Sequence, residues 1–259
     1  GTLENSITTI TGKDDQVWAG TKKGLCNINT VTNTINWYSI NQGGLPHNSV
    51  NSLFLDKEER LWISTNSSII SYMQDGKINR IPLSTGSGFL TLGSVCEDDA
   101  SRIWVGSRGN GVFIIDFDSI LYLTTKQGLL SDYCYSLISD DHYNIWIGHK
   151  GGLSRIRTTD YSVKPFQNTE GIPNDYQSVQ NAILVDQDRR ILVGSDRGLI
   201  IYDPKMELPL QVPPVLGFTS IRVNDEETDF EGNKITLSPG RYKIRIDFFG
   251  ASLKAPALV

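Results

Sequence analysis

The sequence has few cysteines that could form disulfides, no long apolar run that could cross a membrane and no basic cluster that could bind nucleic acid. It has 3 cysteines among 259 residues, and Cys26, Cys96 and Cys134 lack the C-x-x-C spacing of zinc and redox sites. We expect each to be a small buried apolar residue. No apolar run approaches the roughly 18 residues that a membrane-spanning helix needs. The 24 basic residues are outnumbered by 29 acidic residues and form no cluster, so the charge pattern does not favour nucleic acid as a partner.

Catalytic signatures are also missing. The sequence contains no nucleophile elbow, P-loop, HExxH motif or Cys–His pair. The histidines His47, His142 and His149 do not have metal-ligand spacing. Asp175 and Asp196 are the acids expected near a binding face, and two isolated carboxylates make a weak catalytic pair. We therefore expect no enzyme activity, no metal site and no cofactor in this chain.

What the sequence does contain is a phrase that recurs five times. WAGTKKGL, WVGSRGNGV and WIGHKGGL are three of its copies. The copies align on a large apolar anchor residue, with spacings of 44, 42, 42 and 46 residues. A tiny residue follows each anchor by two positions, and in four copies an aspartate precedes it by six. The anchors are Trp18, Trp62, Trp104, Trp146 and Leu192. A register kept over five copies indicates a repeat architecture.

Each copy contains a succession of short strands. In the second copy the strand-like runs are SVNSLFLD, LWIST, IISYM and INRIPL, and an Asp-Gly turn joins the last two. Four antiparallel strands repeated every ~40–45 residues indicate a β-propeller blade, whereas a solenoid, the structural rival, usually has shorter or helical repeats. We therefore expect an all-β fold with a β-propeller of four-stranded blades, of which five repeats are present as part of a larger ring.

The constant positions of the repeat predict architectural roles. Each anchor indole should pack between neighbouring blades, where its flat ring covers a large area. The glycine two residues later should let the adjacent sheet approach closely. The aspartate should cap the turn between the first two strands through backbone N–H groups. None of these recurring carboxylates is expected to be catalytic.

The sequence pattern changes near residue 204. We expect five propeller repeats in residues 1–204, a proline-rich linker in residues 205–213 and an incomplete Ig-like β-sandwich in residues 214–259. The fifth repeat supplies three strands and no convincing fourth, which favours a contribution from sequence before Gly1 to the same ring. RYKIRIDFF alternates apolar and charged residues, as a strand with one wet face does. A full sandwich needs about 100 residues, more than remain here.

The repeat phrases and linkers resemble a known family. DDQVWAGTKKGL, DASRIWVGSRGNGV, YNIWIGHKGGL and the spacer GGLPHNSVNSL resemble the two-component regulator propeller repeat. The segment from PPVLGFTSIRVND to FFGASLKAP resembles the start of the triple-tyrosine Ig-like domain. That order is typical of the periplasmic sensor region of Bacteroides-type hybrid two-component systems. Two copies depart from the pattern: LWISTNSSI lacks both glycines and ILVGSDRGL lacks the tryptophan.

The resemblance implies a function. The chain would be the periplasmic ligand-sensing part of a hybrid sensor histidine kinase and response regulator, which recognises glycan-derived oligosaccharides to control polysaccharide-utilisation genes. The resemblance also implies a homodimer, with the membrane and DNA contacted only by parts of the parent protein outside this chain. The alternative is a non-catalytic protein-interaction scaffold whose propeller grips a peptide.

Two sets of loops should share one face of the propeller. One set precedes the first strand of each blade and the other joins the second strand to the third, and their residues vary while the framework stays constant. Tyr133, Tyr135 and Tyr176 offer aromatic faces for a sugar, and the basic candidates suit an acidic sugar or a sulfate. The candidate ligand-binding residues are His47, Asn48, Arg108, Asn110, Tyr133, His149, Lys150, Asp175, Tyr176 and Arg197.

Overall fold

The computed structural model describes residues 6–42, 44–83, 90–116, 119–140, 142–167, 172, 175–206, 215–227 and 236–251. The chain forms two compact units, Gly1–Pro204 and Lys205–Val259. The described residues form β-strands and two short 3-10 turns, η2 (Thr125–Gln127) and η4 (Pro204–Met206). None of their helical turns is long and apolar enough to cross a membrane. The all-β fold expected from the sequence is confirmed.

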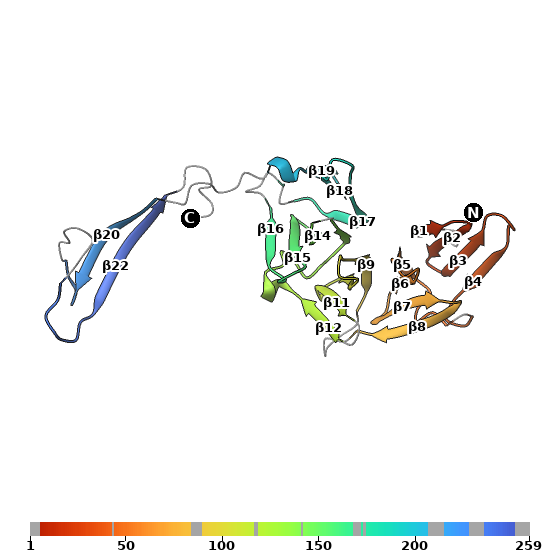
Figure 1. Ribbon diagram of the computed structural model, residues 1–259, viewed down its shortest axis with the longest axis horizontal. Helices are drawn as coiled ribbons and strands as arrows, with labels where there is room; N and C mark the ends of the chain where they lie inside the picture. Colours follow the sequence, from red (N-terminus) through yellow and green to blue (C-terminus); the bar gives the residue numbers. More distant parts are fainter. Residues whose placement is uncertain are drawn as a thin grey trace. The chain divides into compact units, whose positions relative to one another are not determined.

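Five antiparallel sheets follow one another along the first unit (Figure 1). The first sheet contains β1 (Ile7–Lys13), β2 (Gln16–Thr21), β3 (Gly24–Asn29) and β4 (Ile35–Tyr38). The second contains β5 (Val50–Leu55), β6 (Leu61–Thr65), β7 (Ile69–Gln74) and β8 (Lys77–Pro82). The third contains β9 (Leu92–Glu97), β10 (Ile103–Ser107), β11 (Val112–Asp116) and β12 (Ser119–Leu123). The fourth contains β13 (Ser136–Ser139), β14 (Asn144–Gly148), β15 (Leu153–Arg157) and β16 (Val163–Phe166). The fifth contains β17 (Ser178–Val185), β18 (Ile191–Ser195) and β19 (Gly198–Tyr202).

The sheets are arranged as propeller blades, with their first strands together and their fourth strands outside. The first strands β5, β9, β13 and β17 contact one another in chain order. Every residue of β9 is buried, whereas four of the five residues of β12 are exposed. The apolar cores lie between neighbouring sheets: Trp104 packs with Leu137 and Ile145 of the fourth sheet. The predicted packing of anchor indoles between blades is therefore confirmed.

The recurring aspartate caps the turn between the first two strands, as predicted, and also holds the anchor indole. Asp98 Oδ1 accepts the backbone N–H groups of Ala100 at 2.9 Å and Arg102 at 3.0 Å. Its Oδ2 accepts Arg102 Nε at 2.7 Å and Trp104 Nε1 at 2.8 Å. We call this arrangement of Asp98, Arg102 and Trp104 the Asp–Trp clamp. It fixes the turn, the arginine and the indole through one buried carboxylate.

The clamp is found in three of the five sheets, and in the fourth Asn144 takes the place of the arginine and donates Nδ2 to Asp140 Oδ2 at 3.1 Å. In the second sheet Asp56 Oδ2 accepts Trp62 Nε1 at 2.7 Å, and in the fourth Asp140 Oδ2 accepts Trp146 Nε1 at 2.8 Å. In the fifth sheet the anchor is leucine, so Asp186 holds no indole. It bonds the Arg190 side chain at 2.7 Å and accepts the backbone N–H groups of Asp188 and Arg190 at 2.9 and 2.8 Å. The first sheet has a glycine at the aspartate position and therefore no clamp.

Glycines and cysteines take the places that the sequence predicted. A Cβ on Gly106 would lie 2.6 Å from Leu137 Cδ1 of the next sheet, and one on Gly148 would lie 2.3 Å from Ser178 Oγ. Neighbouring sheets therefore approach each other at these positions more closely than a side chain allows. The three cysteines are buried and unpaired.

The second unit is a three-stranded antiparallel sheet in the order β21-β20-β22. Its strands are β20 (Val215–Val223), β21 (Glu226–Glu227) and β22 (Ile244–Ala251). The expected one-sided burial of β22 is not observed: Ile244, Ile246 and Phe248 are 55%, 49% and 70% exposed. The described part of this unit is a single layer, which has no second sheet to cover its apolar face. Most of the predicted linker, residues 207–213, lies outside the described residues.

Candidate functional site

The two loop sets meet at one end of the sheets, as the sequence predicted. Gly109 N and Gly111 N, between the second and third strands of the third sheet, donate to Asp132 O at 3.0 and 2.9 Å. Gly151 N likewise donates to Tyr176 O at 2.8 Å. We call this surface the loop face. Its described residues are 22–23, 39–42, 44–49, 66–68, 90–91, 108–111, 124–135, 149–152, 172, 175–177 and 196–197.

The structure brings the candidate residues Arg108 and Tyr133 together. Their backbones form an isolated antiparallel bridge. The Tyr133 ring is 51% exposed and stacks on Tyr135 at 6.4 Å between ring centres, with 27° between the planes. The Arg108 guanidinium donates to the side-chain oxygen of Gln180 in the fifth sheet. A residue with a cationic side chain and a residue with an exposed aromatic ring are thus paired through their backbones on the loop face.

The amide side chains of Gln180 and Asn181 and the main-chain carbonyl of Asn51, which the sequence did not single out, complete this group. Asn181 Nδ2 donates to Asn51 O at 2.9 Å, and Gln180 Nε2 donates to the same carbonyl at 3.3 Å. The buried Asn181 Oδ1 accepts no hydrogen bond within the described part of the chain. We call Asn51, Arg108, Tyr133, Gln180 and Asn181 the central cluster. It joins the second, third and fifth sheets across the inner strands and carries both donors and acceptors.

The central cluster depends on an irregularity in β17. Ser178 pairs with Ser195 and Ile183 pairs with Val193, so residues 179–182 lie opposite a single residue of β18. Asn181 adopts a left-handed backbone with φ 59°. Such a bulge re-aims side chains out of the ladder, which brings Gln180 to Asn51. The one sequence signal for it was the 46-residue spacing before the fifth anchor, the longest of the four.

His149 is an interior residue and cannot contact a ligand on the loop face. It is 0% exposed, with Nδ1 2.9 Å from Tyr133 O and Nε2 3.0 Å from Ser154 Oγ. A carbonyl can only accept, so Nδ1 carries the hydrogen and Nε2 accepts from the serine hydroxyl. Burial lowers the pKa of His149 to about 4 and keeps the ring neutral. The other four copies have threonine or serine at this position.

Tyr176 is also unavailable to a ligand. It is 2% exposed and packs with Trp146 and Ile191 between the fourth and fifth sheets. Burial raises the pKa of its phenol, whose buried oxygen finds no hydrogen-bond partner among the described residues. The side chain therefore contributes apolar packing behind the loop face. From the sequence, Tyr176 could not be distinguished from an exposed binding tyrosine, because the composition of a loop does not reveal the direction of a side chain.

Asp175, Arg197 and Lys150 form a second group on the loop face. Asp175 Oδ2 and Arg197 Nη1 lie 2.5 Å apart, and each side chain is 61% exposed. Lys150 is exposed, and its backbone bridges Gln177 beside them. Because Arg197 already has a carboxylate partner, Lys150 is the more accessible cation of this group for an anionic ligand.

The remaining candidates shape their own loops. His47 Nδ1 accepts the N–H of Ser49 at 3.0 Å, and Asn48 Oδ1 accepts the N–H of Ile40 at 2.9 Å. The N–H of Asn110 donates to Ser107 Oγ at 3.1 Å. These contacts brace backbone turns, as polar loop residues commonly do. Within the described ranges, no three His, Cys, Asp or Glu side chains gather closely enough to hold a metal ion.

Residues 44–67 match the two-component regulator propeller family. The matched stretch covers the linker before β5 and both strands of the first hairpin in the second sheet. It is the copy that lacks both glycines of the phrase. The resemblance recognised in the sequence is confirmed by this match.

Three known proteins show the range of this similarity. A histidine kinase of Formosa agariphila is 23% identical, over 91% of this chain and 18% of the kinase. A structure described as the extracellular domain of a hybrid two-component system from B. thetaiotaomicron has a TM-score of 0.71 and 20% identity, covering 90% of this chain and 32% of that one. Virginiamycin B lyase from Staphylococcus aureus has a TM-score of 0.59 and 16% identity, covering 82% and 73%.

These comparisons establish what the chain is similar to. It spans less than a third of the length of either signalling relative. At such identities the structural matches show the propeller fold alone, and the lyase demonstrates that this fold also carries catalysis. The chain has the fold of the extracellular domains of two-component sensor systems and carries a regulator propeller repeat at residues 44–67.

Proposed function

We propose that this chain is the periplasmic, non-catalytic ligand-reading part of a hybrid two-component sensor, and that its ligand is a glycan-derived oligosaccharide bound at the central cluster. The observation that carries the proposal is that an exposed tyrosine ring, a guanidinium and two side-chain amides are grouped at the loop face. Aromatic faces stack on the apolar faces of sugar rings, while planar polar groups bond their hydroxyls.

The charges of the loop face favour an acidic sugar. Arg108 has a neutral amide, Gln180, as its side-chain partner, so its positive charge is available to a carboxylate or sulfate. Exposed Lys150 adds a second cation to the same face. A uronic acid or a sulfated sugar therefore matches the face better than a neutral one.

Ligand binding would act on signalling by population shift. A ligand that bonds Asn51, Arg108 and Gln180 together ties the second, third and fifth sheets to one another. It therefore favours whichever arrangement of the sheets holds these residues at bonding distance. In the parent protein, which we expect to be a homodimer, this preference would be passed to the kinase.

Calorimetric titration of the chain with neutral, uronic-acid and sulfated oligosaccharides tests the proposal. We expect Tyr133→Ala to weaken the best ligand by about tenfold and Arg108→Gln by at least as much, through loss of the ring and of the charged hydrogen bond. Tyr122→Ala is the matched control, because Tyr122 is similarly exposed at 49% but lies on the outer strand β12. If no sugar binds, and the chain instead captures a protein in a way that is lost in Arg108→Gln, the interaction-scaffold alternative is supported.

A further inference from the structure

The outer strand of the first sheet presents an edge without charged residues. Among the described residues, β4 pairs with β3 alone. The sequence from Gly24 to Leu55, which contains both strands, has no Asp, Glu, Lys or Arg, although such residues make up 20% of the chain. Ile35 and Trp37 of β4 are 58% and 48% exposed. A strand edge that carries exposed apolar side chains and no charge is a template for pairing with another strand.

The other outer strands carry residues that discourage such pairing. β8 has a lysine, an arginine and a proline in its sequence KINRIP, and β16 has a lysine and a proline in VKPF. β12 begins with Ser119, which pairs with Asp116. Charged side chains and prolines are the residues with which natural proteins protect strand edges. The first sheet therefore differs from the other four-stranded sheets at its outer edge.

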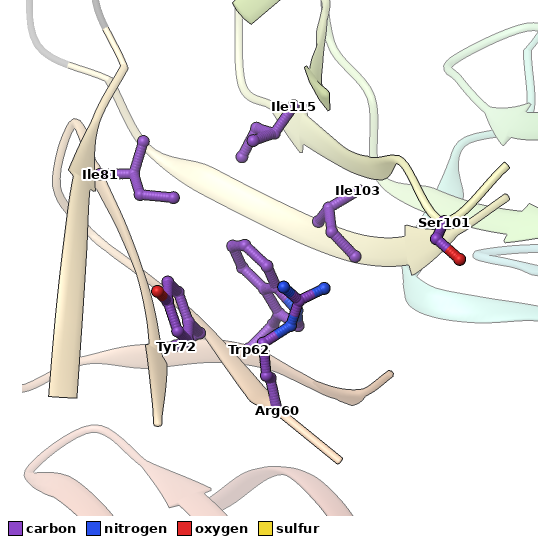
Figure 2. Close-up of a pocket in the computed structure, with 7 residues that line it drawn as sticks. All are labelled: Arg60, Trp62, Tyr72, Ile81, Ser101, Ile103 and Ile115. Atoms are coloured by element: carbon purple, nitrogen blue, oxygen red, sulfur yellow. The ribbon is translucent and has the colours of Figure 1, made fainter. Parts of the chain in front are cut away.

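The apolar face of β4 is also uncovered. In the third sheet, Ile103 and Ile115 are 2% and 7% exposed because the second sheet packs against them. Figure 2 shows both residues lining a shared hollow with Trp62, the anchor of that second sheet. In the first sheet Ile28 is the repeat equivalent of Ile115, and Ile35 pairs with it. No sheet of the described residues covers this face of the first sheet in the same way, which leaves Ile35 exposed.

The hydrogen-bond register of β4 suits pairing with a second copy of itself. Asn29 N donates to Thr34 O at 3.0 Å and closes the β3–β4 hairpin. Because bonded pairs alternate along an antiparallel ladder, the backbone groups of Ile35 and Trp37 point away from β3. An antiparallel second copy centred on Asn36 places each Ile35 opposite the other copy's Trp37. Each of these pairs then exchanges both N–H···O bonds.

We propose that β4 joins β4 of a second copy of this chain, so that two first sheets form one continuous antiparallel sheet about a twofold axis at Asn36. On one face, Ile35 of each copy packs beside Trp37 of the other, a β-branched and aromatic pair of the kind that stabilises sheets. On the opposite face the two Asn36 side chains meet, and an amide both donates and accepts. A second copy suits this edge because Ile-Asn-Trp alternates apolar, amide and apolar in both directions, as a twofold interface requires.

Sedimentation velocity of the chain over a series of micromolar concentrations tests the proposal. The native chain is expected to dimerise. Asn36→Lys should weaken the dimer at least about tenfold, because like charges would lie directly opposite each other across the axis. Asn36→Asp should weaken it for the same reason. An equimolar mixture of the two variants should dimerise again, because a lysine then faces an aspartate.

Asn79→Lys is the matched control. Asn79 is exposed on β8 and takes the place of Asn36 in the second sheet, since each lies two strands from its anchor tryptophan in the pairing register. This variant should leave the dimer unchanged. Tyr133→Ala, on the loop face, should also leave it unchanged, so the dimer and the sugar site can fail independently.

A cysteine cross-link keeps the proposal falsifiable if the charged variants fail to fold. Residues directly opposite in a non-bonded antiparallel pair have the closest side chains, so Asn36→Cys should form a disulfide-linked dimer on oxidation and Asn79→Cys should not. The three native cysteines are buried. The proposal is overturned by a native chain that stays monomeric, by a dimer that Asn36→Lys leaves intact, by a mixture of the two charged variants that stays monomeric, or by the absence of the Asn36→Cys cross-link.

Discussion

The first and third sheets contain the same repeat motif, but its anchor tryptophan is buried and bonded differently in each. In the third, Trp104 is fully buried and held by Asp98, with a neighbouring sheet on each side. In the first, glycine replaces the aspartate, Gln16 replaces the arginine and Trp18 is only half-buried. Gln16 there accepts the Asn27 side-chain N–H at 2.9 Å instead of supporting the turn. An anchor tryptophan therefore stabilises its blade to the extent that its N–H group and both its faces find partners.

Removal of the clamp carboxylate should give the largest stability change. Asp98→Ala leaves Arg102, the indole N–H and two backbone N–H groups without their buried acceptor, which we expect to cost about 3–5 kcal/mol. Asp186→Ala is the matched control in the fifth sheet, because that aspartate has no indole to hold and is 18% exposed against 0% for Asp98. In urea unfolding we expect Asp186→Ala to lose clearly less free energy of unfolding than Asp98→Ala. Equal losses would show that the indole bond adds nothing.

The fourth sheet extends the comparison to pH. His149 has a pKa of about 4 in the folded chain and about 6.5 when unfolded, so it binds more protons in the unfolded state. Its contribution is fully present above pH ~6.5 and is lost as the pH falls toward ~4, by about 3 kcal/mol in total. His149→Ser, which adopts the residue type of the other copies, should flatten this part of the stability profile. An unchanged slope between pH ~6.5 and ~4 would contradict the assignment of a buried neutral imidazole.

A clamp cannot be restored in the first sheet by one substitution. A Cβ on Gly12 would lie 2.8 Å from Gln16 O, so Gly12→Asp must displace the backbone of the turn. We expect a loss of about 1–3 kcal/mol rather than a gain. Thermal unfolding of the variant beside the native chain measures the sign. A higher unfolding temperature would mean that the turn relaxes into the geometry seen at Asp98.

The smallest effect should come from the exposed ion pair. Arg197 and Asp175 are 2.5 Å apart, as close as any clamp contact, but each is 61% exposed. Solvent screens such a pair, so Arg197→Ala should change the free energy of unfolding by less than about 1 kcal/mol. A double-mutant cycle with Asp175→Ala measures the coupling energy. A coupling energy as large as the loss expected for Asp98→Ala would contradict the predicted difference between the exposed ion pair and the buried clamp.

The sequence predicted those features that depend on spacing. The period, the anchors, the turn-capping role of Asp98 and the meeting of the two loop sets all follow from residues a fixed distance apart. The indole bond to Asp98 was not predicted because it depends on the rotamer of Trp104. His149 and Tyr176 could not be distinguished from accessible loop residues because burial is set by the neighbouring blade. Gln180 and Asn181 were missed because a bulge, rather than strand alternation, aims them.

The Asp–Trp clamp also bears on the order of assembly. Its members span seven consecutive residues, Asp98 to Trp104, so every bond in it is local in the chain. Hairpins form in about 1–10 μs, much sooner than contacts between distant segments of a chain. Each clamped hairpin can therefore acquire its turn and the orientation of its indole as soon as it leaves the ribosome. The indole would already project correctly when the next hairpin emerges to cover it, so the propeller can grow by successive addition from its amino-terminal end.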